Sequence, residues 1–284
     1  MKYYYYAHSG HKHGLDRVRR AVALIKAYAT RGIEVELLVN DFRAGLAAKE
    51  LGVRDSVTIE TFLDIDAVAQ RGDVVFADTA EEFDARIEEY AELFDPLYRI
   101  VDDCDKVSLH GEVVVKPPHK ERGDDSLVAT FIESAYFDTV EKTQRVLFFY
   151  GDADYDKELL AHREFFAGLD MELVLGEYFF VKYDDELAKI FTTVYENEEY
   201  TEMITSSSIV VTASIQTALE ARASQAQVVY MKREGDSECQ LKLLDEVGVQ
   251  IINYFDKDGL SSALSTTKSE KKLPIEENIS NKQL

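Results

Sequence analysis

The sequence predicts a two-domain α/β protein in which each domain is a parallel sheet covered by helices. First, 284 residues with 46% hydrophobic content suffice for two cores of ordinary size. Second, short apolar strands alternate with amphipathic helices, which is typical of parallel sheets. Third, this alternation restarts near residue 145. We therefore expect an N-terminal Rossmann-like domain over 1–135, a C-terminal one over 136–265, and a polar, flexible tail over 266–284.

The first half opens with an aromatic strand at 2–7, a loop that contains glycine, and a helix at 17–29 with apolar residues at helical spacing. Further strands are predicted at 33–39, 73–77, 99–101 and 112–115, and further helices at 43–51 and 81–93. The turn-rich stretch 116–125 follows, so the first domain should end shortly after it.

The second half repeats the alternation. Strands are predicted at 145–150, 171–175, 208–212 and 227–231. Helices are predicted at 155–166, 215–223 and 237–247, the last of them ended by a glycine. No repeat of 20 to 50 residues accompanies this two-fold alternation, which argues against a solenoid.

Composition excludes several classes of function. A formal charge of -22 repels phosphodiester backbones, so we expect no nucleic-acid partner. No apolar run approaches the ~20 residues that span a bilayer, and the first residues are too polar for a signal sequence, so we expect a cytoplasmic protein without a membrane span. Cys104 and Cys239 lack the spacing of a zinc site, and we interpret them as incidental thiols of a reducing compartment.

Three loops follow predicted strands and precede helices, the position at which parallel sheets bind anions. They are the loop 8–17, the turn 151–154, and the turn 213–217. The first holds three of the six histidines, and with the start of its helix it forms a local positive segment in an acidic chain. Each loop could instead be a tight turn or a helix cap without a ligand. If the two halves face each other, the three loops line one shared site.

The run S-S-S-I-V-V-T-A-S-I-Q-T-A-L-E at 206–220 resembles the donor-binding half of GT-B enzymes. It is similar to the MurG-like transferases and, more closely, to the UDP-sugar hydrolase of the pseudaminic acid pathway. The segments 236–240 and 244–248 belong to the same resemblance to the donor-binding half, and the segments 14–20 and 148–154 and the acidic residue Asp78 line up with that hydrolase too. The resemblance covers the chain to about residue 255. It implies the GT-B fold, with two Rossmann-like domains and an interdomain cleft.

The resemblance also implies roles for individual residues. The turn Ser214, Ile215, Gln216 and Thr217 would receive the pyrophosphate, and Glu220 would accept hydrogen bonds from the ribose hydroxyls. Further substrate contacts are implied for Gly14, Asp78, Gly151 and Gln240. For Glu220 the alternative is an exposed helix carboxylate without a ligand.

The sequence departs from the hydrolase pattern at the catalytic position. Arg17 stands where that family has a histidine, and a guanidinium cannot act as a base at neutral pH. Asp78 is followed by Thr79 and Ala80 rather than by the family's aromatic residue. In the turn 151–154, Asp152 replaces a glycine and places a carboxylate near the proposed diphosphate, where a cation could offset it.

Other residues of the first loop could supply the missing base. We predict His13 as the general base, because it precedes the glycine turn, with His11 and Asp16 as alternatives and Asp16 as a catalytic residue that could orient a histidine. Arg17 and Arg20 would stabilise negative charge on the phosphate. The histidines could instead be a solvated cluster. Their H-x-x-H-x-H spacing does not define a metal site, so we expect neither metal nor cofactor.

Two functions remain compatible with the sequence. The first is a UDP-sugar hydrolase or glycosyltransferase-like enzyme that acts at the anomeric carbon, in surface-glycan or nonulosonic acid synthesis. The second is a non-catalytic nucleotide-sugar-binding or regulatory relative that lost the catalytic histidine, which the presence of Arg17 favours. In both, the expected partner is a small-molecule nucleotide-sugar. The sugar, the acceptor and the oligomeric state are left open.

Overall fold

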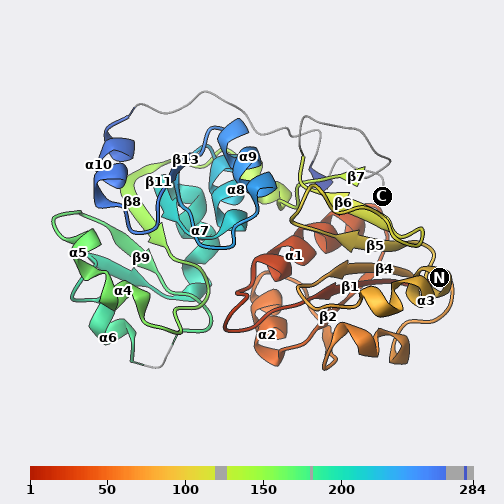
Figure 1. The fold of residues 1–284 in the computed structure, drawn as a ribbon. Coiled ribbons are helices and arrows are strands. Elements are labelled where there is room, and N and C mark those ends of the chain that lie inside the picture. The colour runs from red at the N-terminus through yellow and green to blue at the C-terminus, as the bar shows by residue number, and fades with distance from the viewer. Residues whose placement is uncertain (119–126, 180–181, 267–277, 280–284) are drawn as a thin grey trace.

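The computed structural model describes residues 1–118, 127–179, 182–266 and 278–279. Two lobes, each built on one parallel sheet with helices on both faces, make up the chain (Figure 1). The prediction of two α/β domains is therefore confirmed. The last strand of the first sheet ends at Val128 and the first strand of the second begins at Thr143. The expected turn at 116–125 lies mostly outside the described residues.

The N-terminal sheet has seven strands in the order β3-β2-β1-β4-β5-β6-β7. They are β1 Tyr3–Ala7, β2 Val35–Val39, β3 Ser56–Thr58, β4 Val74–Asp78, β5 Leu97–Ile100, β6 Val113–Lys116 and β7 Leu127–Val128. Helices α1 (Asp16–Ala29) and α2 (Phe42–Glu50) pack on one face, and η1 (Phe62–Ala67) and α3 (Ile87–Leu93), preceded by η2 (Asp84–Arg86), pack on the other. In β1, Tyr5 joins the first of these cores while Tyr4 and Tyr6 join the second, because successive side chains of a strand alternate between faces.

The C-terminal sheet has six strands in the order β10-β9-β8-β11-β12-β13. They are β8 Thr143–Phe149, β9 Glu172–Val174, β10 Thr193–Tyr195, β11 Ser207–Thr212, β12 Gln227–Met231 and β13 Gln250–Ile252. One face is covered by α7 (Tyr200–Ser206), α8 (Ile215–Ala223) and α9 (Glu238–Glu246). The other is covered by α4 (Glu158–Ala161), α5 (Arg163–Phe166), α6 (Asp184–Leu187) and α10 (Lys257–Ser265). Between the domains lies η3 (Ser134–Phe137), and η4 (Asn197–Glu199) precedes α7.

In each sheet, the direction in which successive strands are added reverses beside the first strand of that sheet. The chain builds outward from β1 to β3 and then continues from β4 on the other side, and it does the same around β8 and β11. Such a switch point leaves a crevice at the carboxyl ends of the two central strands, where open α/β sheets bind ligands. Each domain therefore presents one crevice, formed by the loops after β1 and β4 in one domain and after β8 and β11 in the other.

Asn278 and Ile279 lie against the N-terminal domain (Figure 1). Asn278 and Ile279 are 1% and 0% exposed, although we expected a flexible tail. The side-chain amide of Asn278 donates to the carbonyl of Ile132 at 2.8 Å and accepts from its N–H at 2.9 Å, and Ile279 N donates to Thr130 O at 2.8 Å. An asparagine side chain can pair with a peptide group in this way, so a polar tail residue is buried without loss of hydrogen bonds. The rest of the predicted tail, apart from residue 266, lies outside the described residues.

A disulfide joins Cys104, after β5, to Cys239, in the first turn of α9, with their Cα atoms 5.6 Å apart. The interpretation of two incidental thiols is therefore wrong for this structure. The reason is tertiary: Ser237 Oγ donates to Asp102 O at 2.6 Å, which sets the two segments side by side. Because the two cysteines are 135 residues apart, the sequence alone did not indicate this contact.

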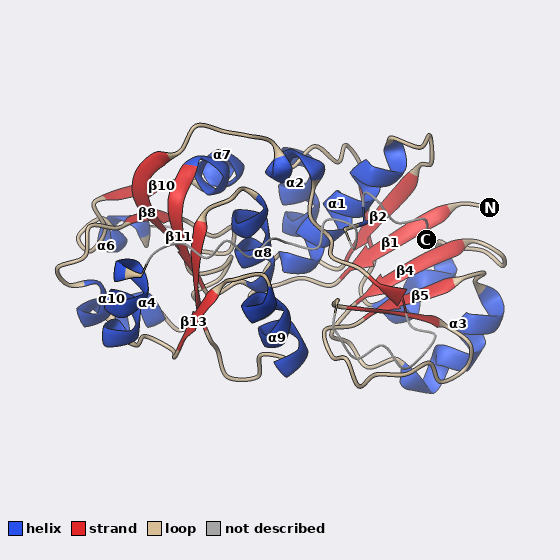
Figure 2. Cartoon of the chain, turned by 90° about the horizontal axis from the view of Figure 1, so that it is seen from above, coloured by secondary structure: helices blue, strands red, loops and turns tan. Residues whose placement is uncertain are grey.

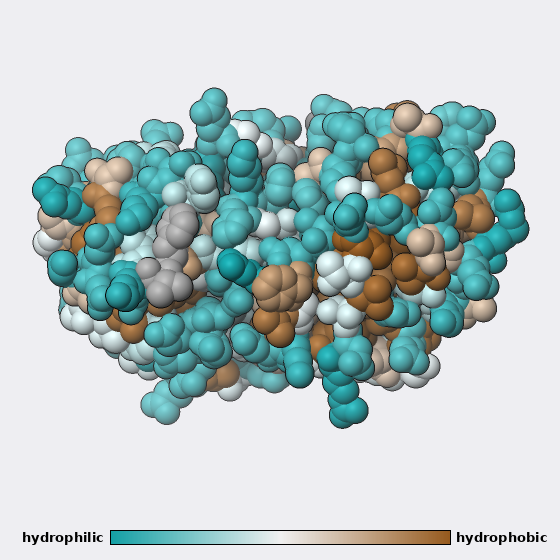
Figure 3. Space-filling model, turned by 90° about the horizontal axis from the view of Figure 1, so that it is seen from below, coloured by the Kyte–Doolittle hydropathy of each residue, from teal (hydrophilic) through white to brown (hydrophobic). Residues whose placement is uncertain are grey.

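The face in Figure 3 is mostly hydrophilic, in keeping with the formal charge of -22. Apolar side chains gather in a smaller region of that face (Figure 3). Over the whole described surface, the large apolar side chains most exposed after Met1 include Phe42 and Tyr155, at 64% and 61%. In the part of the chain that the structure describes, every helix is too short or too polar to span a lipid bilayer.

Candidate functional site

The two domains meet through α1 and α8, which lie at the boundary between the sheets (Figure 2). Helix α1 follows β1 and helix α8 follows β11, so each begins at the switch point of its own sheet. The loop 8–15 and the turn 213–214 consequently face each other, and the loop after β8 completes the contact. The three loops predicted from the sequence are thus brought together.

Glycine allows the first loop to come close to the other domain. Gly10 and Gly14 have φ angles of 137° and 63°, and the N–H groups of His13 and Gly14 donate to Gly10 O at 3.0 and 2.8 Å. A Cβ atom at Gly14 would lie 3.4 Å from Asp152 Oδ2. The left-handed φ therefore favours glycine at position 14.

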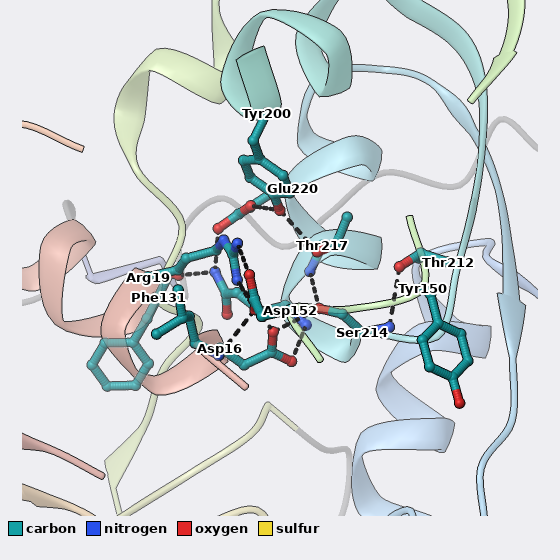
Figure 4. Close-up of polar contacts among 12 residues, drawn as sticks. Asp16, Arg19, Phe131, Tyr150, Asp152, Tyr200, Thr212, Ser214, Thr217 and Glu220 are labelled. Carbon is teal, nitrogen blue, oxygen red and sulfur yellow. Dashed lines mark hydrogen bonds and ion pairs between the residues drawn. The ribbon is translucent and has the colours of Figure 1, made fainter. Parts of the chain in front are cut away.

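A buried ion pair joins the domains beside this turn (Figure 4). Arg19 Nη1 and Nη2 donate to the two carboxylate oxygens of Asp152, both at 2.7 Å, and Leu15 N donates to Asp152 Oδ2 at 2.9 Å. The two side chains are only 7% and 3% exposed, and the guanidinium lies 4.3 Å from the ring centre of Tyr200. Arg19 is thus the cation that offsets the carboxylate of Asp152.

Two predicted site residues bind each other. The carboxylate of Asp16 accepts from Ser214 Oγ at 2.7 Å and from Gln216 N at 3.4 Å (Figure 4). Ser214 Oγ in turn accepts from Thr217 N at 3.0 Å, as a helix N-cap does. Ile215 packs against the C-terminal core. The first turn of α8, predicted to receive the pyrophosphate, therefore holds the carboxylate predicted to act in catalysis.

Glu220 is buried, at 2% exposed, rather than open to the cleft. Its carboxylate accepts from Tyr200 OH at 2.6 Å and from Gln216 Nε2 at 2.8 Å, and Gln216 Nε2 also donates to Phe131 O at 2.7 Å. Burial raises the pKa of Glu220 to about 7, although Arg19 and the two hydrogen bonds oppose the shift. The alternative of an exposed carboxylate is therefore wrong, and the ribose contact stays a prediction.

The remaining predicted cations are paired with carboxylates. Arg20 donates to both oxygens of Asp78 at 2.8 and 2.7 Å and to Asp102 Oδ1 at 2.8 Å. Arg17 lies 3.5 Å from Asp78 and 3.7 Å from Asp102, and Gln240 Nε2 donates to Asp102 at 2.8 Å. Burial by itself would raise the pKa of Asp102, but the positive charges of Arg20 and Arg17 outweigh this effect and lower the pKa below its ordinary value. The positive charge expected for this segment is therefore largely neutralised within the protein.

A pocket of about 320 Å³ lies between the domains. Its walls come from the loop after β1, the loop after β8, the end of β11 and the segment after β12; they include His11, Lys12, His13, Gly14, Asp16, Tyr150, Gly151, Asp152, Asp154, Tyr155, Asp156, Glu158, Ser214 and Arg233. Five of the predicted site residues line it, namely His13, Gly14, Asp16, Gly151 and Ser214. Arg17, Arg20, Asp78, Glu220 and Gln240 do not.

His13 is held in an environment that disfavours its cationic form. Its ring centre lies 4.6 Å from that of His8. Burial lowers the pKa of His13 below its usual 6.5, and the positive charges of His8 and Arg17 lower it further. At neutral pH the ring is therefore mainly uncharged and able to accept a proton.

Arg233 was missed by the sequence reasoning. It follows β12, so its place at the carboxyl end of a predicted strand was a usable signal. Its guanidinium lies 4.2 Å from the ring centre of Tyr150 and donates to the carbonyl of that residue. Gly151, with a φ of 128°, leaves room for it, since a Cβ there would lie 3.3 Å from Arg233 Nη2. Within the described ranges, no group of three or more His, Cys, Asp or Glu residues is arranged to hold a metal ion.

Solved structures to which the chain is similar include three proteins in complex with UDP. The chain is similar to MnaA from S. aureus in complex with UDP, with a TM-score of 0.61 and 12% identity over 93% of this chain and 87% of that one. It is similar to the UDP-GlcNAc 2-epimerase of Methanocaldococcus jannaschii in complex with UDP-GlcNAc and UDP, with a TM-score of 0.58 and 11% identity over 95% and 94%. HepE from Anabaena, in complex with UDP and glucose, gives a TM-score of 0.57 and 12% identity over 92% and 88%.

At this level of identity the likeness establishes the fold. The chain has the GT-B arrangement of two Rossmann-like domains with a pocket between them. No protein-family model matches the sequence, and no curated protein matches it either.

Proposed function

We propose that this protein binds a UDP-sugar in the interdomain pocket and acts on its anomeric carbon, by hydrolysis or by glycosyl transfer. The observation that carries the proposal is the position of the pocket, at the switch points of both sheets, with cationic or ionisable groups from both domains on its walls. The UDP and UDP-GlcNAc bound by proteins of the same fold support this ligand class. The resemblance to the pseudaminic acid pathway hydrolase supports the hydrolytic version, in surface-glycan or nonulosonic acid synthesis.

His13 is the group we propose as general base. It lines the pocket, and its lowered pKa keeps the ring neutral at pH 7. In hydrolysis, a water oxygen would attack the anomeric carbon while its proton passes to His13. The bond from that carbon to the phosphate oxygen would break, and the electron pair would leave with UDP. Asp16 is engaged by Ser214 and Gln216, so in our proposal it orients the loop rather than taking the proton.

A second candidate is a protein that binds a nucleotide-sugar without turning it over. The arrangement around Arg17 favours it, because this residue replaces the catalytic histidine of the resembled family and lies against Asp78 and Asp102. An ion-paired guanidinium can hold a loop in place but cannot accept a proton. This candidate predicts ligand binding with no product.

The test is to incubate the full chain with UDP-, GDP- and CMP-sugars while following thermal stability and nucleotide release. We expect stabilisation by UDP-sugars and release of UDP. His13→Ala should lower turnover by about 10² to 10⁴ with little change in affinity, since general-base catalysis contributes on that order. His110→Ala, which removes an exposed histidine outside the pocket, is the control. Binding without turnover would select the second candidate, and absence of binding across the panel would refute both.

A further inference from the structure

Arg233 is held in a fixed position by its own turn. Its N–H donates to Asp236 Oδ2 at 2.6 Å, and the same oxygen accepts from Tyr230 OH at 2.8 Å. The guanidinium lies over the ring of Tyr150 and hydrogen-bonds to its carbonyl. Because the main-chain N–H and the guanidinium of Arg233 are both held, the residue loses little further freedom when it binds a ligand, which favours tight contact.

The charge of Arg233 has no counter-ion within the described part of the protein. Arg19 is paired with Asp152, and Arg20 with Asp78 and Asp102. Arg233 forms no ion pair with any residue that the structure describes, and its Nε is buried without a hydrogen-bond partner. Because a half-buried cation is costly without an anion, this arrangement is stabilised when an anion comes from outside.

Five carboxylates line the pocket, and within the described residues none of them forms an ion pair with Arg233: Asp16, Asp152, Asp154, Asp156 and Glu158. Asp152 is bound by Arg19, and Asp16 by Ser214. Asp154 accepts from Tyr183 OH at 2.5 Å and from Glu158 N at 2.7 Å. On the side of the N-terminal domain, the pocket wall holds His11, Lys12 and His13. An anion in the pocket would therefore have cationic or proton-donating groups on two sides.

We propose that Arg233 binds a phosphate group of the pocket's ligand, so that the ligand is a phosphate or diphosphate ester held between the two domains. The proposal rests on the function proposed above and names a residue and a ligand group for that site. A planar guanidinium presents two parallel N–H donors to a phosphate, which an ammonium group cannot do. Gly151 helps to place Arg233, since the Cβ of any larger residue there would lie too close to the guanidinium.

The test compares Arg233→Gln, Arg233→Lys and the matched control Lys232→Gln by titration calorimetry of the full chain with inorganic pyrophosphate and with UDP. Lys232 is the adjacent cation, but it pairs with Glu238 at 3.1 Å. We expect Arg233→Gln to lower affinity for both probes by about 10- to 100-fold, the range for a hydrogen bond to a charged group. Lys232→Gln should change it by less than about 3-fold, as for an exposed charge.

Arg233→Lys keeps the positive charge and tests whether the planar guanidinium is needed. It also allows the proposal to be tested if Arg233→Gln fails to fold. It should recover only part of the affinity, because the planar pair of donors is lost. Wild-type affinity in Arg233→Gln would overturn the assignment and leave the proposed function standing. Arg233-dependent binding of pyrophosphate without binding of UDP would support the assignment and refute the nucleotide-sugar. Binding of neither probe by the wild type would overturn both.

Discussion

The arginines of α1 and Arg233 differ in how their charges are balanced. Arg19 and Arg20 are buried or nearly so and bind carboxylates at 2.7–2.8 Å, whereas Arg233 contacts an aromatic ring and a carbonyl and pairs with no described carboxylate. Arg19 therefore joins the two domains, Arg20 binds carboxylates within the N-terminal domain, and Arg233 is available to a ligand. A run of basic residues therefore identifies charge but not its use, because the use depends on carboxylates far away in the sequence.

The largest expected effect comes from breaking the buried pair. Arg19→Met leaves Asp152 buried without its cation, so the free energy of unfolding should fall by about 3–5 kcal/mol. Arg163→Met, at a side chain 73% exposed, should change it by less than about 0.5 kcal/mol. Urea unfolding measures both. Adding Asp152→Asn to Arg19→Met should restore part of the loss, and a loss below about 1 kcal/mol for Arg19→Met would contradict the role assigned to this pair.

The disulfide should stabilise the same interface somewhat less. Cys104→Ser removes a cross-link between residues 135 apart, so we expect a loss of about 2–4 kcal/mol for the oxidised protein. Guanidinium unfolding with and without reductant is the measurement. Reduced wild type should behave like Cys104→Ser, and the variant itself should not respond to reductant. A wild-type curve that is the same in both conditions would rule out the cross-link in solution.

Glu220 gives the interface a pH dependence. With a pKa of about 7 in the folded state and 4.5 as the ordinary value, the folded protein binds more protons between these values. Its contribution to stability is therefore greatest below pH 4.5 and declines as pH rises, by about 2 kcal/mol between pH 5 and 7. Glu220→Gln should remove this decline, while Glu202→Gln, at an exposed position of α7, should keep it.

The same variant also tests the predicted ribose contact. Because Glu220 is only 2% exposed, we expect Glu220→Gln to retain UDP affinity within about 3-fold of the wild type once the protein is folded. A loss of 2 to 3 kcal/mol in UDP binding, as two missing hydroxyl hydrogen bonds would cause, would restore the sequence-based interpretation.

At Lys12 we expect only small effects on stability and on binding. Its side chain is exposed and lines the pocket. Lys12→Gln should leave the free energy of unfolding within about 0.5 kcal/mol and weaken UDP binding by no more than about 5-fold, as for a solvated charge. Thermal melts and UDP titration check the two statements. A loss of UDP affinity in Lys12→Gln as large as that in Arg233→Gln would contradict the view that Arg233 is the held, ligand-binding cation and Lys12 a solvated one.

Periodicity was enough to predict the central elements of both sheets. The helix expected at 215–223 and the strand at 227–231 have those bounds in the structure, because long apolar segments carry a clear pattern. The three-residue edge strands β3, β10 and β13 were not predicted, whereas β9, which is as short but lies inside its sheet, was predicted within 171–175. A short edge strand carries little pattern and is fixed by its one neighbour in the sheet. The helix expected at 155–166 is broken into α4 and α5 at His162.

The partners of the charged residues could not be predicted. Which loops meet follows from two parallel sheets and their switch points, and that much was expected. Arg19 binds Asp152, which is 133 residues away, and Asp16 binds the first turn of α8. Both contacts depend on how the two domains are oriented relative to each other. The segment 127–132, with Gln216 on one side and Asn278 on the other, fixes that arrangement, and no local pattern reveals such contacts.

A crystal structure of the full chain with UDP would show directly whether the interdomain pocket binds this nucleotide. We predict UDP in the interdomain pocket, with its diphosphate between Arg233 and the loop that carries His11 and His13. UDP bound elsewhere on the molecule, or crystals grown at saturating UDP with this pocket holding no nucleotide, would contradict the assignment of this pocket as a nucleotide-sugar site.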